Sequence, residues 1–168
     1  MRGITLIGMP GSGKSTVGKI LSQRLGLNFV DLDTYISIKE KKKIGVIVKK
    51  HGDSALSQLE ERYSLKIPLK DVVFSPGGSI VYSEAAMKRL QIETVIFFLN
   101  VSFEEMSKRL VDTGERGIVG LREKSLEELY RERLPLYQSY AAYTVDATGS
   151  DPQTIADTIV SMLDQSHS

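Results

Sequence analysis

Residues 8 to 15 are Gly8-Met9-Pro10-Gly11-Ser12-Gly13-Lys14-Ser15, and they carry the most specific pattern in the chain. It matches the pattern G-x-x-x-x-G-K-[ST], whose glycines let the backbone curl until successive N–H groups point at phosphate oxygens. The lysine adds a mobile positive charge, and the final serine offers a hard oxygen ligand for Mg²⁺. The stretch therefore predicts a loop for ATP and Mg²⁺, with contacts from Gly11, Ser12, Gly13, Lys14, Ser15 and Thr16. The alternative is an ordinary glycine-rich turn.

The segments on either side of this loop fit that prediction. Ile4–Ile7 is a short apolar run that predicts a buried strand. Apolar residues then recur at helical spacing from Lys14 to Leu25, and Gly26 is a typical helix stop. A strand before the loop and a helix after it are what the mechanism requires, because the positive N-terminal end of the helix faces the bound phosphate.

Strands and helices alternate along the rest of the chain. A parallel sheet with helices on both faces, an α/β fold, follows from this alternation. Pro135 is expected to kink or interrupt the helix in which it lies. Further strands are expected at 28–31, 72–74, 94–99 and 143–145, and further helices at 44–50, 55–67, 83–90, 103–111, 125–142 and 152–163.

Composition narrows the class of protein. With 22 basic and 21 acidic residues the formal charge is +1, which gives no sign of a nucleic-acid arm or a membrane-binding face. The lysine run 41–43 is expected to be a solvated helix end or loop. The absence of cysteine excludes disulfides and thiolate metal sites. We expect one domain over residues 1–168, cytoplasmic and monomeric, without nucleic-acid or membrane partners.

Four further motifs give the chain a family resemblance. Asp31-Leu32-Asp33 ends the second strand and Gly77-Gly78 follows the third. Arg116 lies in a glycine-containing loop, and Arg133-Leu134-Pro135-Leu136-Tyr137 lies on the penultimate helix. In this order, and over almost the full length, the motifs resemble those of shikimate kinases in the nucleoside-monophosphate-kinase-like group.

The resemblance implies a P-loop NTPase fold with a five-stranded parallel sheet in the order 2-3-1-4-5, flanked by helices on both faces. It also implies two insertions. A substrate-binding insertion would cover about residues 31–62, and a lid over ATP would cover about residues 112–124.

The resemblance also assigns roles, residue by residue. Asp31 would lie near Mg²⁺ together with Ser15, and Asp33 would hydrogen-bond the acceptor hydroxyl and take its proton. Arg116 would neutralise charge on the transferred phosphoryl group. The implied catalytic residues are Lys14, Asp33 and Arg116, and the implied substrate-binding residues are Asp33, Gly77, Gly78 and Arg133, the last gripping a carboxylate.

Simpler interpretations remain for these residues. Carboxylates at i and i+2 on a strand end share a face, which favours a joint site for Asp31 and Asp33, but Asp33 could instead cap a helix. Gly77-Gly78 could be a plain turn. Arg133 could form a surface ion pair with Glu128 or Glu132.

The chain departs from the family pattern around the acceptor carboxylate and the lid. Ser57 stands where the family has a second arginine, although Glu60 is retained. Losing such a pair should cost about 2–4 kcal/mol of binding free energy. Arg62 could compensate, but it projects to another side of the helix. Ser79 replaces the third glycine of the usual triplet.

The lid arginine is followed by Gly117-Ile118-Val119 in place of Pro-Leu-Leu, which should loosen the open lid. Residues 148–152 offer no arginine to stack on adenine.

The sequence thus predicts a small-molecule kinase that uses ATP and Mg²⁺, with shikimate as acceptor and shikimate 3-phosphate as product. Three alternatives stay open. The acceptor could be another small polyol or hydroxy acid, as in a gluconate-type kinase. The chain could be a nucleotide-binding protein that has lost turnover. It could also be a nucleoside-monophosphate kinase, although basic residues for an acceptor phosphate are few in 31–62.

Overall fold

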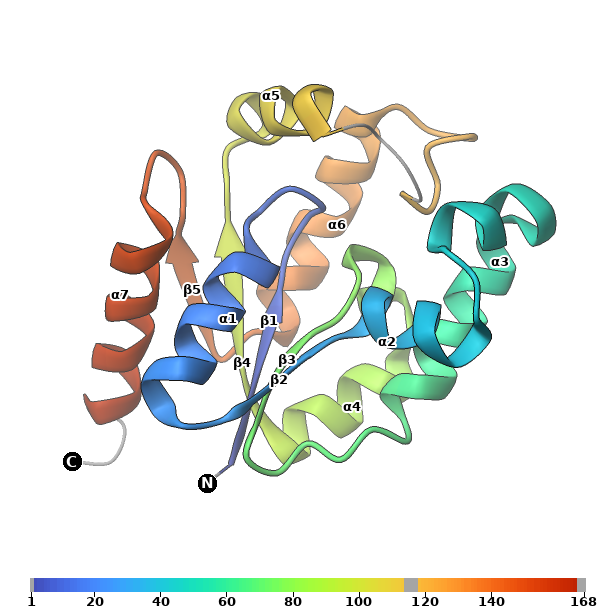
Figure 1. Cartoon of the computed structure of the whole chain (residues 1–168). Helices are drawn as coiled ribbons and strands as arrows, with labels where there is room; N and C mark the ends of the chain where they lie inside the picture. Colours follow the sequence, from blue (N-terminus) through green and yellow to red (C-terminus); the bar gives the residue numbers. More distant parts are fainter. Residues whose placement is uncertain (1, 114–117, 166–168) are drawn as a thin grey trace.

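A computed structural model describes residues 2–113 and 118–165, and a five-stranded parallel sheet lies at its centre (Figure 1). The order β2-β3-β1-β4-β5 confirms the expected 2-3-1-4-5 arrangement. Ile4 of the central strand pairs with Val73 on one side and Val95 on the other. The strands are β1 (Gly3–Ile7), β2 (Asn28–Asp31), β3 (Val72–Ser75), β4 (Thr94–Asn100) and β5 (Tyr143–Asp146).

Helices cover both faces of this sheet, as expected for parallel strands (Figure 1). One face is covered by α1 (Lys14–Leu25) and α7 (Pro152–Gln165), which pack against each other. The other face carries α4 (Glu84–Glu93) and α6 (Leu126–Tyr140). The α5 helix (Phe103–Thr113) lies above the carboxyl ends of the strands.

Two further helices project beside the sheet, in the range where the substrate-binding insertion is expected. They are α2 (Leu32–Glu40) and α3 (Ile44–Ser64), which pack together at the right of Figure 1. Gly52 interrupts α3 with φ 81° and ψ 176°, a conformation that favours glycine. The two helices expected at 44–50 and 55–67 are therefore the two halves of α3.

Pro135 does not interrupt α6, so that part of the expectation was wrong. The helix begins at a capping box, in which the Ser125 side chain and the Glu128 carboxylate satisfy each other's backbone N–H groups. Pro135 is exposed on the helix surface.

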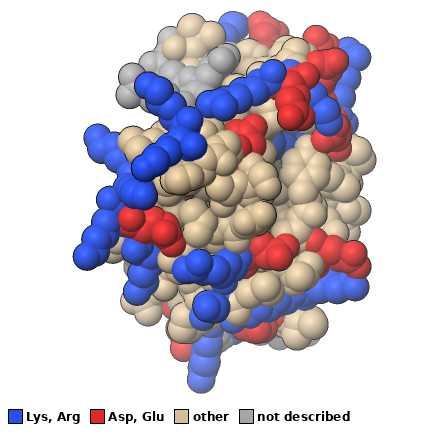
Figure 2. All heavy atoms as spheres, turned by 90° about the vertical axis from the view of Figure 1, so that its right-hand side faces the viewer, with Lys and Arg blue, Asp and Glu red and all other residues tan. Residues whose placement is uncertain are grey.

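Lysine and arginine side chains gather on the face that carries the insertion (Figure 2). The expected solvated run 41–43 is exposed there, as are Lys49 and Lys50. Within residues 2–113 and 118–165, no helix is both long enough and apolar enough to cross a lipid bilayer.

Candidate active site

The loop of residues 8–15 curls around the end of the Lys14 side chain. Lys14 Nζ donates to the carbonyl oxygens of Gly8 and Met9, both at 2.9 Å, and to Ser12 Oγ at 3.4 Å. Only 9% of the lysine is exposed. Burial lowers the pKa of Lys14 to about 8, although the Asp33 and Asp31 carboxylates oppose this effect. Burial disfavours the charged form of this lysine, and a bound anion would favour it. Such a side chain is typical of a site that receives an anion.

Glycine is required at both ends of the loop. Gly8 has φ 152°, and a Cβ there would meet the Leu99 carbonyl oxygen at 2.8 Å. Gly13 has φ 92° and precedes the first residue of α1. Its left-handed backbone turns the chain directly from the loop into the helix. The free N–H groups at the start of this helix then face a cavity that Lys14 and Ser15 help to line, which we call the hollow.

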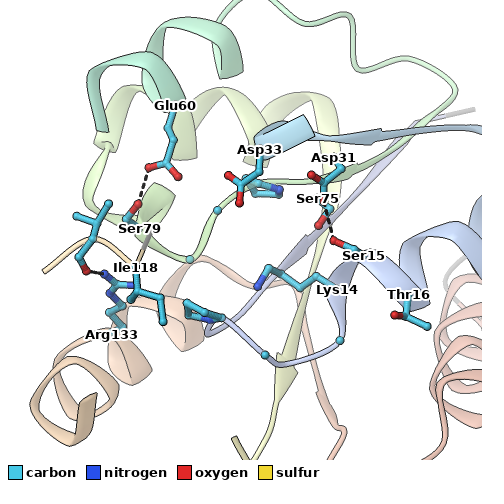
Figure 3. Close-up of a pocket in the computed structure, with 17 residues that line it drawn as sticks. Lys14, Ser15, Thr16, Asp31, Asp33, Glu60, Ser75, Ser79, Ile118 and Arg133 are labelled. Atoms are coloured by element: carbon cyan, nitrogen blue, oxygen red, sulfur yellow. Dashed lines mark hydrogen bonds between the residues drawn. The ribbon is translucent and has the colours of Figure 1, made fainter. Parts of the chain in front are cut away.

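Ser15 and Asp31 meet at the mouth of this hollow (Figure 3). Ser15 Oγ donates to Asp31 Oδ2 at 2.6 Å. The other carboxylate oxygen of Asp31 accepts from Thr34 N at 3.0 Å and so caps α2. The helix cap considered for Asp33 is therefore made by Asp31 instead.

Asp33 lies in the first turn of α2, so the strand argument for its direction was wrong. It nevertheless faces the same hollow as Asp31 and Lys14 (Figure 3). The side chain is exposed at the hollow, but the protein around it partly desolvates its carboxylate. This desolvation raises the pKa of Asp33, and the Asp31 carboxylate raises it further, whereas Lys14 lowers it.

The Gly77-Gly78 turn is closely packed, so that a side chain at either position would require its neighbours to move. A Cβ on Gly77 would lie 2.1 Å from Glu60 Oε1, and a Cβ on Gly78 would lie 2.9 Å from Pro10 Cδ. These glycines open the short 3-10 helix η1 (Gly78–Tyr82). The backbone of these glycines lines the hollow, where a ligand could approach it closely. Contact between them and an acceptor stays a prediction.

Arg133 is buried, so the surface ion pair considered for it is not formed. It is 1% exposed, and its guanidinium donates to Tyr82 Oη at 3.3 Å and to the Val119 carbonyl oxygen at 2.7 Å. Glu132 instead pairs with Lys124, while Glu128 caps α6. In the part of the chain that the structure describes, no carboxylate forms an ion pair with Arg133, which leaves its charge available to an anionic ligand.

These side chains line one hollow of about 320 Å³. Ser12 does not line it, being buried beneath the loop where it contacts Lys14. Arg116 and Gly117 lie outside the described residues. The hollow brings together Gly11, Gly13, Lys14, Ser15, Thr16, Asp31, Asp33, Gly77, Gly78 and Arg133 of the sequence-predicted site, with Pro10, Glu60, Ser75, Pro76, Ser79, Ile118 and Val119.

Ser57 and Ser79, the two departures near the acceptor site, lie close to Glu60. Ser79 Oγ donates to Glu60 Oε2. Ser57 lines a separate cavity of about 190 Å³, which shares Glu60 and Ser79 with the main hollow. Arg62 does not compensate for Ser57, because it pairs with Glu40 at 3.6 Å on another side of the insertion.

Sequence analysis missed roles for two residues. Glu60 is only 3% exposed, and its burial raises the pKa to about 7 although the Ser79 hydrogen bond lowers it. Its retention in the family segment was the available signal. Arg109 of α5 donates to the Gly11 carbonyl oxygen at 3.1 Å and pairs with Glu105. It thus places a cation beside the loop, and no motif around it indicated this.

The donors at the mouth of the hollow fit Mg²⁺. The ion favours few protein oxygens and takes the rest of its ligands from phosphate and water. Ser15 Oγ and Asp31 Oδ2 are such oxygens and already lie in contact. Within residues 2–113 and 118–165 no cluster of three or more His, Asp or Glu side chains could hold a metal alone. The arrangement suits a metal that arrives with a polyphosphate.

Comparison with known proteins gives a consistent result. A family model described as "Shikimate kinase" matches residues 10–164. The chain is 36% identical to the shikimate kinase of Thermodesulfovibrio yellowstonii, over 95% of this chain and 94% of the relative. It is 32% identical to that of Persephonella marina, over 97% and 99%.

Solved structures agree with the sequence matches. A shikimate kinase from Acinetobacter baumannii in complex with shikimate superposes with a TM-score of 0.86 at 26% identity, covering 97% of this chain and 93% of that one. The enzyme from Aquifex aeolicus gives 0.80 at 28% identity, covering 98% and 97%. A deoxyadenosine kinase from M. mycoides, 17% identical with a TM-score of 0.58, shares the fold.

Proposed function

The chain belongs to the shikimate kinase family of small-molecule kinases, and from this premise we propose that it transfers the γ-phosphate of ATP to a hydroxyl of shikimate with Mg²⁺. The observation that carries the proposal is the hollow itself. It places a buried lysine and a Ser15–Asp31 pair at one end, and a buried arginine without a carboxylate partner among the described residues at the other. A polyphosphate suits the first end, and an acceptor with a carboxylate suits the second.

In the proposed mechanism, Lys14 and the N–H groups of the loop bind the β- and γ-phosphates. When bound, Mg²⁺ neutralises phosphate charge, and Ser15 and Asp31 are the residues that would hold it. Asp33 orients the acceptor hydroxyl and accepts its proton at a carboxylate oxygen. Its raised pKa brings it closer to the working pH of a general base. Arg133 holds the acceptor carboxylate, and N–H groups at Gly77-Gly78 contact the acceptor.

The lid completes this proposal. Residues 112–124 would close over ATP, with Arg116 on the transferred phosphoryl group. Closure would exclude water, which would otherwise accept the phosphate. Arg109 would add positive charge beside the loop. We further propose a single domain that acts as a cytoplasmic monomer.

The test of this function is ADP release by the purified protein with Mg-ATP, with and without millimolar shikimate. Stimulation by shikimate is the expected result. The uncharged methyl ester of shikimate is the matched probe, since it keeps the hydroxyls and lacks the carboxylate. No stimulation by shikimate, with ATP still bound, would contradict the proposed acceptor.

Replacing Arg133 should affect acceptor binding selectively. Arg133→Met should raise the KM for shikimate about 100-fold, the loss expected for a charge-assisted pair, and leave the KM for ATP within about threefold. It should also abolish the preference for shikimate over the methyl ester. Arg131→Met is the control, because Arg131 is exposed on the same helix and pairs with Glu127. Equal KM values in the two variants would remove Arg133 from the acceptor site.

The lowered pKa of Lys14 predicts a pH dependence. Lys14 loses its proton as pH rises through about 8, so kcat/KM for ATP should fall above that pH, because this parameter reports the free enzyme. Bound phosphates favour the charged lysine, so kcat at saturating ATP should persist to higher pH. Initial rates between about pH 6.5 and 10 measure both curves. A kcat/KM that stays flat to about pH 9.5 would contradict the assignment.

A less acidic polyol is the second candidate acceptor. The observation in its favour is that the described cations of the hollow are Lys14 and Arg133, while Ser57 lies outside it. Two acidic side chains, Asp33 and Glu60, line the same hollow. A stronger response to the methyl ester or to neutral polyols than to shikimate would favour this candidate.

A further inference from the structure

The Val119–Gly120 peptide group lies between a buried cation and a carboxylate. Arg133 Nη2 donates to the Val119 carbonyl oxygen at 2.7 Å, a bond marked in Figure 3. The Gly120 N–H donates to Asp53 Oδ2 at 2.8 Å. This carbonyl and this N–H belong to one peptide unit, whose dipole of about 3.5 D therefore has its negative end at Arg133 and its positive end at Asp53. We call the guanidinium, this peptide and the Asp53 carboxylate the lid bridge.

The lid bridge joins three parts of the fold. Asp53 follows the break in α3 and so belongs to the insertion. Val119 and Gly120 lie in the expected lid range, and Arg133 lies on α6. Ile118 and Val119 line the hollow described above. The bridge thus fixes a piece of the wall against which an acceptor would lie.

The peptide is also fixed from the side of α6. Gly120 has φ 92°, and a Cβ there would lie 2.9 Å from Cδ2 of the buried Leu129. The Gly120 carbonyl oxygen accepts from the N–H groups of Glu123 and Lys124 at 3.1 and 3.0 Å. Gly120 thus packs against Leu129 of α6, and its carbonyl oxygen is held by the turn before that helix, while its N–H contacts Asp53 of α3.

The position of the Asp53 side chain depends on its hydrogen bond with the Gly120 N–H. Its Oδ1 atom is buried and has no hydrogen-bond partner among the residues that the structure describes. Among the described residues, the hydrogen bond from the Gly120 N–H is thus the contact that holds this carboxylate beside the Val119–Gly120 peptide. The Val119 carbonyl oxygen accepts from a guanidinium and the Gly120 N–H donates to a carboxylate. Both hydrogen bonds are therefore charge-assisted and stronger than hydrogen bonds between neutral groups.

The bridge has a consequence for Arg133. A long arginine side chain loses rotamer freedom when it binds an anion, and contacts that fix it beforehand reduce that loss. Tyr82 Oη fixes one side of the guanidinium at Nε, and the Val119 carbonyl oxygen fixes Nη2. If the Val119–Gly120 peptide could turn away, one of these two contacts would be lost.

On the basis of the proposed function, we propose that Asp53 is a positioning residue for the acceptor. Through the Val119–Gly120 peptide it keeps the Arg133 guanidinium directed at the hollow. Asp53 does not touch the acceptor, so its effect on acceptor binding should depend entirely on Arg133.

Steady-state kinetics of Asp53→Ala and Asp53→Asn test this role. Asp53→Ala should raise the KM for shikimate about 10-fold, the value expected when a hydrogen bond to a charged group is lost. The KM for ATP should change less than about twofold, because the nucleotide end of the hollow is untouched. Asp53→Asn keeps an oxygen that accepts from Gly120 N–H and should stay within about threefold of wild type. Ser54→Ala, at an exposed neighbour, is the control.

A double-mutant cycle separates positioning from a general loss of structure. In the Arg133→Met background, Asp53→Ala should change the KM for shikimate less than about twofold, since the residue through which it acts is gone. Additive effects of the two substitutions would overturn the proposal. So would an unchanged KM for shikimate in Asp53→Ala.

Hydrogen exchange at the Gly120 amide, followed by NMR without ligand, tests the bridge independently of the acceptor. Exchange should accelerate in Asp53→Ala, but not in Asp53→Asn or Ser54→Ala, because only the first removes the acceptor of this N–H. Equal exchange in wild type and Asp53→Ala would overturn the bridge. Absence of shikimate-dependent turnover in the wild type would instead count against the proposed function, and the exchange result would then decide the bridge alone.

Discussion

Lys14→Met should reduce shikimate-dependent turnover about a thousandfold. This is the effect expected when one preorganised positive group that stabilises a developing negative charge is removed. The physical reason is that Lys14 is a buried cation inside the loop, 2.9 Å from two of its carbonyl oxygens, whereas Arg109 contacts the loop from the side of α5. Methionine fills similar space without the charge. The measurement is kcat/KM for ATP and for shikimate, together with ATP binding by calorimetry.

Lys19→Met is the matched control for this experiment, since Lys19 is exposed on the same helix. Its kinetic constants should stay within about twofold of wild type, as is usual for surface substitutions. Thermal unfolding of both variants shows whether the loop still folds. More than about a tenth of wild-type turnover in Lys14→Met would falsify the role of Lys14 in transfer.

Asp33→Asn should lower kcat about 100- to 10,000-fold, the range attributed to general acid–base catalysis. Asparagine keeps the size and one oxygen of the side chain, but it cannot accept the proton of the acceptor hydroxyl. The KM for ATP should change little, because Ser15 and Asp31 remain in contact at the nucleotide end.

The pH dependence distinguishes this role from simple positioning. Desolvation and the Asp31 carboxylate raise the pKa of Asp33, and only the ionised form accepts a proton. Wild-type activity should therefore rise with pH through a pKa above that of an ordinary aspartate, and the remaining activity of Asp33→Asn should lack this rise. An Asp33→Asn variant with the same acidic limb as wild type would assign that limb to another group.

Glu60 shows how a residue with a clear sequence signal still needed the tertiary structure. Its retention beside Ser57 was visible in the chain, but its environment was not. The structure places it in the wall of the hollow, accepting from Ser79 across 19 positions of sequence. This contact is not visible in the sequence. The sequence therefore could not show whether Glu60, with a serine at position 57, is exposed, unpaired or bonded to another residue.

Local chemistry determined much of this protein from the sequence alone. The loop of residues 8–15, the alternation of strands and helices, and the family resemblance predicted the parallel sheet and its order, because each depends on neighbouring residues or on motifs in a fixed succession. They also selected ten of the residues that line the hollow.

The tertiary structure alone decided which distant groups meet. It capped α2 with Asp31 instead of Asp33, buried Arg133 against Tyr82 and Val119, and brought the Asp53 carboxylate to the Gly120 amide. The last two residues are 67 positions apart. Such contacts arise when packed helices bring side chains and loop backbone into one place, and hydrophobic periodicity specifies only which face of each helix is buried.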